Sequence, residues 1–116
     1  MIAADFAEFA AAQFELSAVQ DDGEPLREHL MAAWRQTGKM PKQLEDAPPL
    51  PDHCEAIWRT FLDLHAGRGN TGFGPARLAY NDFDGYQRVT GQRLSAWEIA
   101  MIRSADSAYL ASLPAK

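Results

Sequence analysis

Two stretches in the first part of the chain carry apolar residues at helical spacing. An alanine-rich stretch, residues 3–18, predicts a first helix that ends at the turn residues 21–23. A second helix is predicted to begin near Pro25, because proline is well tolerated in the first helical turn. It should end at Gly38, since glycine accepts the left-handed conformation that follows many helices. The apolar side of this second helix holds Leu26, Leu30, Ala33 and Trp34.

The middle of the chain combines a proline-rich connector with the clearest amphipathic pattern. Residues 41–46 predict one short helical turn, and residues 47–51 contain three prolines and should be extended. Asp52 is predicted to cap the next helix, with Glu55 completing a capping box. The apolar face expected for that helix consists of Cys54, Ile57, Trp58, Phe61, Leu62 and His65.

The last third begins with a glycine-rich stretch, residues 67–75, which predicts a loop. Asn81 is expected to cap a short helix that ends at Gly91. Ser95 and Glu98 form an S-x-x-E capping box that predicts the final helix. Its expected apolar face comprises Leu94, Trp97, Met101, Ile102, Ala105 and Tyr109. Because no period-two alternation lasts beyond four residues, the sequence predicts an all-α fold, a small bundle of about five helices.

Charge and composition exclude several classes of partner. The 116 residues include 16 acidic and 11 basic side chains, and the basic ones are scattered singly, which argues against nucleic acid and anionic membranes. No apolar run is long enough to span a bilayer. The N-terminus has acidic residues where a signal peptide would have basic ones. The single cysteine cannot form an internal disulfide. The expected location is therefore the cytoplasm.

Residues 67–72, Gly-Arg-Gly-Asn-Thr-Gly, match the G-x-G-x-x-G pattern of dinucleotide sites. Such a site needs a buried strand before the motif and a helix directly after it. Here a helix precedes the motif and Phe73-Gly74-Pro75 follows. We expect an ordinary flexible loop, with a small nucleotide-binding protein or hydrolase as the weakest alternative. A third interpretation is that Phe73, exposed between two glycines, anchors a partner protein.

Cysteine, histidine and carboxylate side chains do not form a plausible reaction centre. Cys54 and His65 are eleven residues apart, roughly 16 Å along a helix, which is too far for a shared zinc ion or a nucleophile–base pair. Asp82 and Asp84 lie in a predicted first helical turn, where negative charge complements the helix dipole. We therefore expect no catalytic residues, no metal and no cofactor.

The aromatic residues are more informative. Trp34, Trp58 and Trp97 each lie on the apolar face of a separate predicted helix, so most of the aromatic residues should share one core. Tryptophan and tyrosine also dominate protein–protein hot spots, so one or two are expected to face outward. Better candidates for an exposed position are Phe73 and the N-terminal Phe6, Phe9 and Phe14.

A series of short motifs runs in a characteristic order from Glu24 to Leu110. They are Pro25-Leu26-Arg27-Glu28-His29-Leu30, Arg35-Gln36-Thr37-Gly38-Lys39, Leu50-Pro51, Trp58-x-x-Phe61-x-x-Leu64, Arg68, Gly72-Phe73-Gly74-Pro75, Tyr80, Phe83, Tyr86, Leu94-Ser95-Ala96-Trp97-Glu98, Ile102, Asp106 and Ala108-Tyr109-Leu110. In this order and spacing, the chain resembles the tail assembly chaperones of long-tailed bacteriophages and prophages.

The resemblance implies a non-enzymatic assembly factor of the bacterial host cytoplasm. Such a protein would bind the tape-measure protein, keep its long helices soluble and recruit tail-tube subunits before it departs. Residues 1–20 lie outside the resemblance and form a helical segment of uncertain role, and residues 21–116 form the chaperone-like domain. A structural component retained in the finished tail is the alternative, and self-association stays open. The candidate protein-binding residues are Phe73, Phe6, Phe9, Phe14, Arg68, Trp58 and Trp97.

Overall fold

The computed structural model describes residues 2–114 and confirms an all-α fold. Its helices are α1 (Ile2–Ser17), α2 (Leu26–Thr37), α3 (Lys42–Glu45), α4 (Glu55–Ala66), α5 (Tyr80–Thr90) and α6 (Ala96–Ser112). The one-turn helix α3 accounts for the difference from the five main helices predicted. Within residues 2–114 there is no strand longer than an isolated bridge, and no helix is long and apolar enough to cross a membrane.

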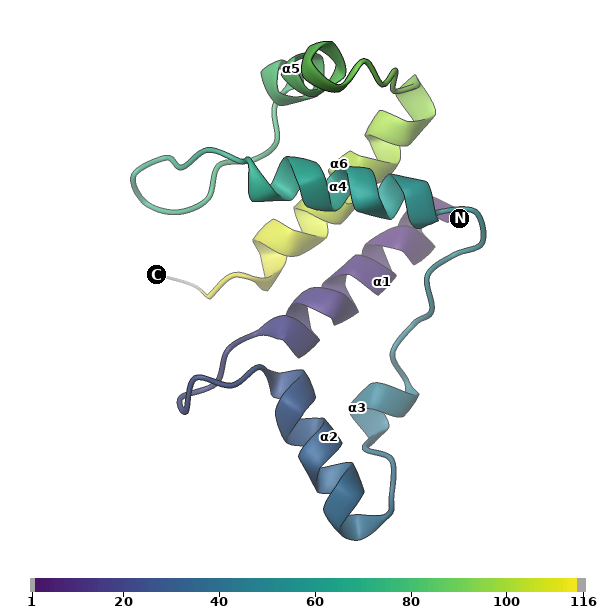
Figure 1. Ribbon diagram of the computed structural model, residues 1–116, viewed down its shortest axis with the longest axis vertical. Coiled ribbons are helices and arrows are strands. Elements are labelled where there is room, and N and C mark those ends of the chain that lie inside the picture. The colour runs from purple at the N-terminus through teal and green to yellow at the C-terminus, as the bar shows by residue number, and fades with distance from the viewer. Residues whose placement is uncertain (1, 115–116) are drawn as a thin grey trace.

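Three helices form the centre of the molecule. Helix α1 packs along α6, and α4 crosses α6, as Figure 1 shows. Helix α5 lies at one end of the long axis, and α2 and α3 lie at the other. The core is built from Phe6, Ala10, Cys54, Ile57, Phe61, Leu64, Leu78, Phe83, Met101, Ile102 and Ala105. Because α1 contributes Phe6 and Ala10, the N-terminal segment takes part in this core.

Two predicted helix starts are wrong by one or more residues. Helix α4 begins after Cys54, and no side chain caps it. His53 has a φ of 64°, in the left-handed region, so the chain turns sharply there and Asp52 does not occupy the cap position. Helix α5 begins after Ala79, because the Asp82 carboxylate accepts the Ala79 N–H at 2.7 Å. That bond moves the start of α5 ahead of Asn81.

Other predicted boundaries are confirmed. The Ser95 hydroxyl accepts the Glu98 N–H at 3.1 Å, and the Glu98 carboxylate accepts the Ser95 N–H at 3.0 Å. This reciprocal pair satisfies two backbone donors at the start of α6. Gly38 and Gly91 both have a φ of 73° and end α2 and α5 in the left-handed conformation.

Residues 19–46, here called the arm, contain α2 and α3 and differ from the rest of the fold. No residue of the arm is buried. The predicted apolar side of α2 is only partly covered, and Trp34 at its end is 37% exposed. The expectation that most aromatic residues share one core therefore does not hold for Trp34.

Candidate protein-binding site

The glycine-rich loop between α4 and α5 folds back on itself as a hydrogen-bonded turn. The Ala76 N–H donates to the Gly69 carbonyl and the Thr71 N–H donates to the Gly74 carbonyl, each at 2.9 Å. Gly72 has a φ of 94°, which an L-residue rarely adopts, so glycine is required at this turn. Phe73 therefore lies at the tip, where its side chain is 81% exposed. The prediction of an exposed Phe73 is confirmed.

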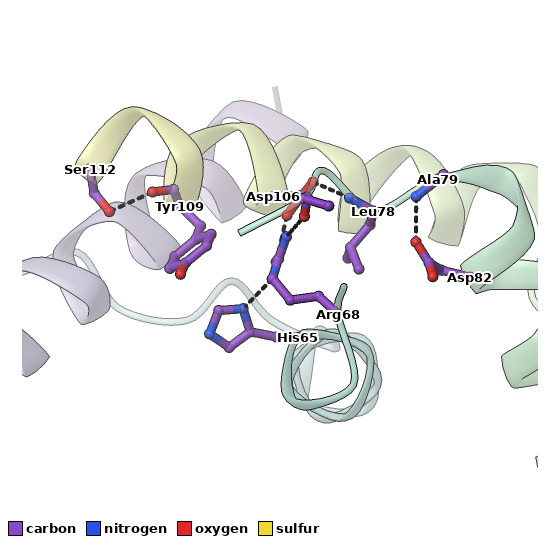
Figure 2. A network of polar contacts seen from close by, with 9 residues as sticks. His65, Arg68, Leu78, Ala79, Asp82, Asp106, Tyr109 and Ser112 are labelled. Atoms are coloured by element: carbon purple, nitrogen blue, oxygen red, sulfur yellow. Dashed lines mark hydrogen bonds and ion pairs between the residues drawn. The ribbon is translucent and has the colours of Figure 1, made fainter. Parts of the chain in front are cut away.

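Arg68, at the start of this loop, points inward toward α6 (Figure 2). Its guanidinium donates to Asp106 Oδ1 at 2.6 Å, to the Ala76 carbonyl at 2.7 Å and to His65 Nδ1 at 3.0 Å. The guanidinium carbon lies 4.6 Å from the centre of the Tyr109 ring. The side chain is only 7% exposed, so Arg68 makes internal contacts and is not presented to a partner.

Asp106 completes the network from the middle of α6. While Oδ1 pairs with Arg68, Oδ2 accepts the Leu78 N–H at 3.0 Å. Its side chain is 2% exposed, and among the described residues every buried side-chain nitrogen and oxygen has a hydrogen-bond partner. A buried ion pair is tolerated only when its remaining polar atoms are satisfied in this way. The pair ties both ends of residues 68–78 to α6.

His65 adds the last polar contact and joins the network to the aromatic core. Burial, and secondly the positive charge of Arg68, lower the pKa of His65. The ring is therefore neutral near pH 7, and its Nδ1 accepts from Arg68, which leaves the proton on Nε2. Its ring also packs against Phe14, Phe61 and Tyr109.

The N-terminal phenylalanines were expected to face outward, and this expectation is wrong. Phe6 is fully buried, and Phe9 and Phe14 are half-buried. The Phe9 ring lies 4.9 Å from Trp58, and the Phe14 ring lies 4.9 Å from Tyr109. Because α1 packs along α6 and beside α4, these phenylalanines fill the space between the helices.

Trp58 and Trp97 were both predicted on apolar helix faces, but they differ in burial. Trp58 is half-buried and packs against Phe6 and Phe61, as expected for a core residue. Trp97, in the first turn of α6, is 51% exposed. Trp97 therefore remains a candidate for a contact surface, together with Phe73.

The sequence analysis did not predict the buried ion pair of Asp106 or the exposure of several apolar side chains. Asp106 lies among the predicted core positions of the last helix, next to Ala105, and a charged residue at such a position signals a buried partner. The missed exposed residues are Ile2, Val19, Met40, Leu62, Tyr80 and Val89. The sequence pattern places Leu62 on the apolar face of α4, where Leu64 is the buried residue instead.

The structure also tests the alternatives that need a nucleotide site, a nucleophilic cysteine or a metal ion. In the described part of the chain no strand precedes Gly67, and the next helix begins only at Tyr80, so the nucleotide-site context is missing. Burial, and secondly the nearby Asp52 charge, raise the pKa of the Cys54 thiol, which disfavours a nucleophilic thiolate. Within residues 2–114 no cluster of three His, Cys, Asp or Glu residues could hold a metal ion.

Comparison with known proteins identifies the family. A family model described as phage tail assembly chaperone matches residues 33–111, more than half of the chain. No curated protein and no solved structure matches the chain. The matched segment contains the end of α2, all of α3, α4 and α5, α6 except its last residue, and the complete loop with Arg68 and Phe73; α1 lies outside it. This chain belongs to the phage tail assembly chaperone family.

Proposed function

We propose that this chaperone works without catalysing a reaction, by reversibly binding the tape-measure protein of the tail through exposed apolar side chains. Phe73, at the tip of the glycine-rich loop, makes the first contact. Tail-tube subunits are the second client, brought to the tape-measure protein before the chaperone leaves. The proposed setting is the cytoplasm of the bacterial host, where tails assemble.

The exposure of Phe73 carries this proposal. A phenylalanine that is 81% exposed leaves a large apolar area in water, and covering that area with a partner is favourable. The loop is also held at both ends by hydrogen bonds to Arg68 and Asp106, whose side chains are almost completely buried, so a partner that binds Phe73 orders little additional chain.

The charge of the protein suits a factor that keeps an apolar client in solution. The formal net charge is −5, and most charged side chains lie on the surface. Net charge of one sign opposes aggregation of the complex while the apolar contact itself remains uncharged.

Coexpression with the tape-measure protein tests the proposal. We expect the wild-type chaperone to raise the soluble fraction of that protein and to copurify with it. Phe73→Ser should abolish both effects, whereas Val89→Ser should retain them. Val89 is a matched control because it is 87% exposed but lies on α5. Unchanged client solubility with the wild type, together with no copurification, would refute client binding; equal losses in both variants would refute the special role of the loop.

Mass spectrometry of purified phage particles separates a chaperone that leaves from a tail component that stays. We expect no peptides of this chain in finished particles, although they should be present in lysates that contain assembling tails. Recovery of the chain from particles in a fixed ratio to tail-tube protein would contradict departure and support the structural alternative.

A further inference from the structure

We propose that Arg68 and Asp106 are positioning residues for client binding: their buried ion pair fixes the loop that displays Phe73. The proposal rests on the proposed function, since it assigns a purpose to the base of the same loop. Neither side chain would touch the client, because both are almost completely buried.

One carboxylate holds the two ends of the loop together. Asp106 Oδ1 accepts from Arg68, the second residue after α4, and Oδ2 accepts from the N–H of Leu78, two residues before α5. Arg68 also donates across the loop to the Ala76 carbonyl. Residues 69–77 are thereby closed into a loop whose base is fixed to α6, as Figure 2 shows for the contacts of Arg68 and Asp106.

Within the loop, the Ala76 N–H to Gly69 and Thr71 N–H to Gly74 backbone hydrogen bonds shape the turn itself. The side-chain contacts within it are solvent-exposed: Thr71 Oγ1 donates to the Gly74 carbonyl, the Gly72 N–H donates to Asn70 Oδ1, and the Phe73 N–H donates to Thr71 Oγ1. Exposed hydrogen bonds of this kind exchange with water at little cost. Three of the residues from 69 to 74 are glycines, which add conformational freedom once the base opens. The turn has its own backbone bonds, but its attachment to α6 runs through Arg68 and Asp106, so the placement of Phe73 relative to α6 depends on the ion pair.

Removing one member of the pair would leave the other charge buried and alone, which can unfold the protein. The informative variant is thus the double substitution Arg68→Met with Asp106→Asn. It leaves no charge in the core, and the amide oxygen of the introduced asparagine can still accept the Leu78 N–H. We expect this variant to keep the wild-type helical circular dichroism spectrum while it loses the bond to Ala76.

Hydrogen exchange tests the positioning role without any client. The Thr71 and Ala76 amides should exchange at least about ten-fold faster in the double variant, whereas the core amides of α6 should be unchanged. Arg68→Lys, which retains the charge but offers fewer directed donors, should give an intermediate rate. Equal loop exchange in the wild type and the double variant would overturn the proposal, whatever the client does.

Binding of the tape-measure protein gives the second readout. The folded double variant should bind about ten-fold more weakly than the wild type, because the looser loop must be ordered on binding. Wild-type affinity in a variant with a demonstrably loosened loop would overturn the positioning role. If Phe73→Ser binds as well as the wild type, the proposed function fails at the loop, while the exchange rates still decide whether the ion pair fixes it.

Discussion

Helices α2 and α4 each have 12 residues and each carry a tryptophan within an apolar face, but they occupy very different environments. Helix α4 buries Ile57, Thr60, Phe61 and Leu64 against α6 and neighbouring aromatic rings. Helix α2 buries no residue, and its main contact with the central helices is with α1. Helical periodicity thus specifies a helix and its apolar face, but a neighbouring element decides whether that face is covered.

Hydrogen bonds near the start of the arm join it to α1 and to the residue that follows α1. The Leu26 N–H donates to the Ala18 carbonyl at 2.9 Å, and Arg27 donates to the Gln13 side chain at 3.1 Å. His29 pairs with Asp22 on the surface, where such pairs add little to stability. An isolated helix of this length is marginal in water, so α2 should open more easily than α4.

The largest expected difference between α4 and α2 is the loss of unfolding free energy when one aromatic residue in each helix is replaced by alanine. Phe61→Ala in α4 should lower the free energy of unfolding by about 3–5 kcal/mol, because it leaves a cavity in the core. Trp34→Ala in α2 should cost less than about 1 kcal/mol, because the side chain is already partly in water. Urea unfolding monitored by circular dichroism measures both values, and similar costs would mean that the arm is part of the cooperative core.

Hydrogen exchange in the wild-type protein should separate the same helices without any mutation. We expect the central amides of α2 to exchange about 100-fold faster than those of α4, because the arm can open without exposing the core. Exchange resolved by residue with nuclear magnetic resonance provides the test. Identical protection in α2 and α4 would contradict local opening of the arm.

Helices α6 and α2 also differ in how their N-termini are capped, with a smaller expected effect on the free energy of unfolding. The capping box of α6 satisfies backbone donors that no side chain satisfies at the start of α2. Ser95→Ala should therefore lower the free energy of unfolding by about 1 kcal/mol. Ser107→Ala, an exposed position in the same helix, is the matched control and should be neutral, because alanine favours helix interiors. A neutral Ser95→Ala would mean that the cap contributes nothing measurable.

The smallest expected effect concerns pH and His65. Its pKa in the folded protein is lowered from the ordinary value of 6.5, so the folded state resists protonation more than the unfolded chain does. This contribution to stability is complete above pH 6.5 and decreases as the pH falls below 6.5 toward the folded-state pKa. His65→Gln preserves an acceptor for Arg68 but does not titrate, so its stability should fall less on acidification.

Unfolding series at several pH values measure this effect, with Ser107→Ala as a control that leaves the network intact. Parallel pH dependences for the wild type and His65→Gln would show that the imidazole does not contribute.

The sequence was most informative where a short local signal decides the structure. Ser95 and Glu98 predict a helix start by themselves, and Gly38 predicts a helix end, because both depend on backbone geometry within one turn. The exposure of Phe73 was predictable for the same reason, since its glycine neighbours require a turn. The Asp52 capping box failed because the connector enters α4 through a left-handed residue at His53.

Contacts between distant residues could not be predicted in the same way. Arg68 was assigned to the surface because its partner, Asp106, lies 38 residues away along the chain. Phe6 was assigned to a binding surface because nothing in α1 reveals that Trp58 of α4 and the rest of the core cover it. The candidate site could thus be located at its tip from the sequence, but its buried base depended on tertiary packing.

The pairing of α1 with α6 joins the two ends of the fold, since Ser104 donates to the Ala3 carbonyl across 101 residues. About 80 residues lie between Ser17 and Ala96, so at a synthesis rate of about 5–20 residues per second α1 precedes its partner by roughly 4–16 s. Throughout that interval the phenylalanines of the nascent α1 have no α6 to cover them. During its own translation, the chaperone therefore passes through a state in which an apolar helix has no neighbour to cover it. We propose that the chaperone protects its client from the same state.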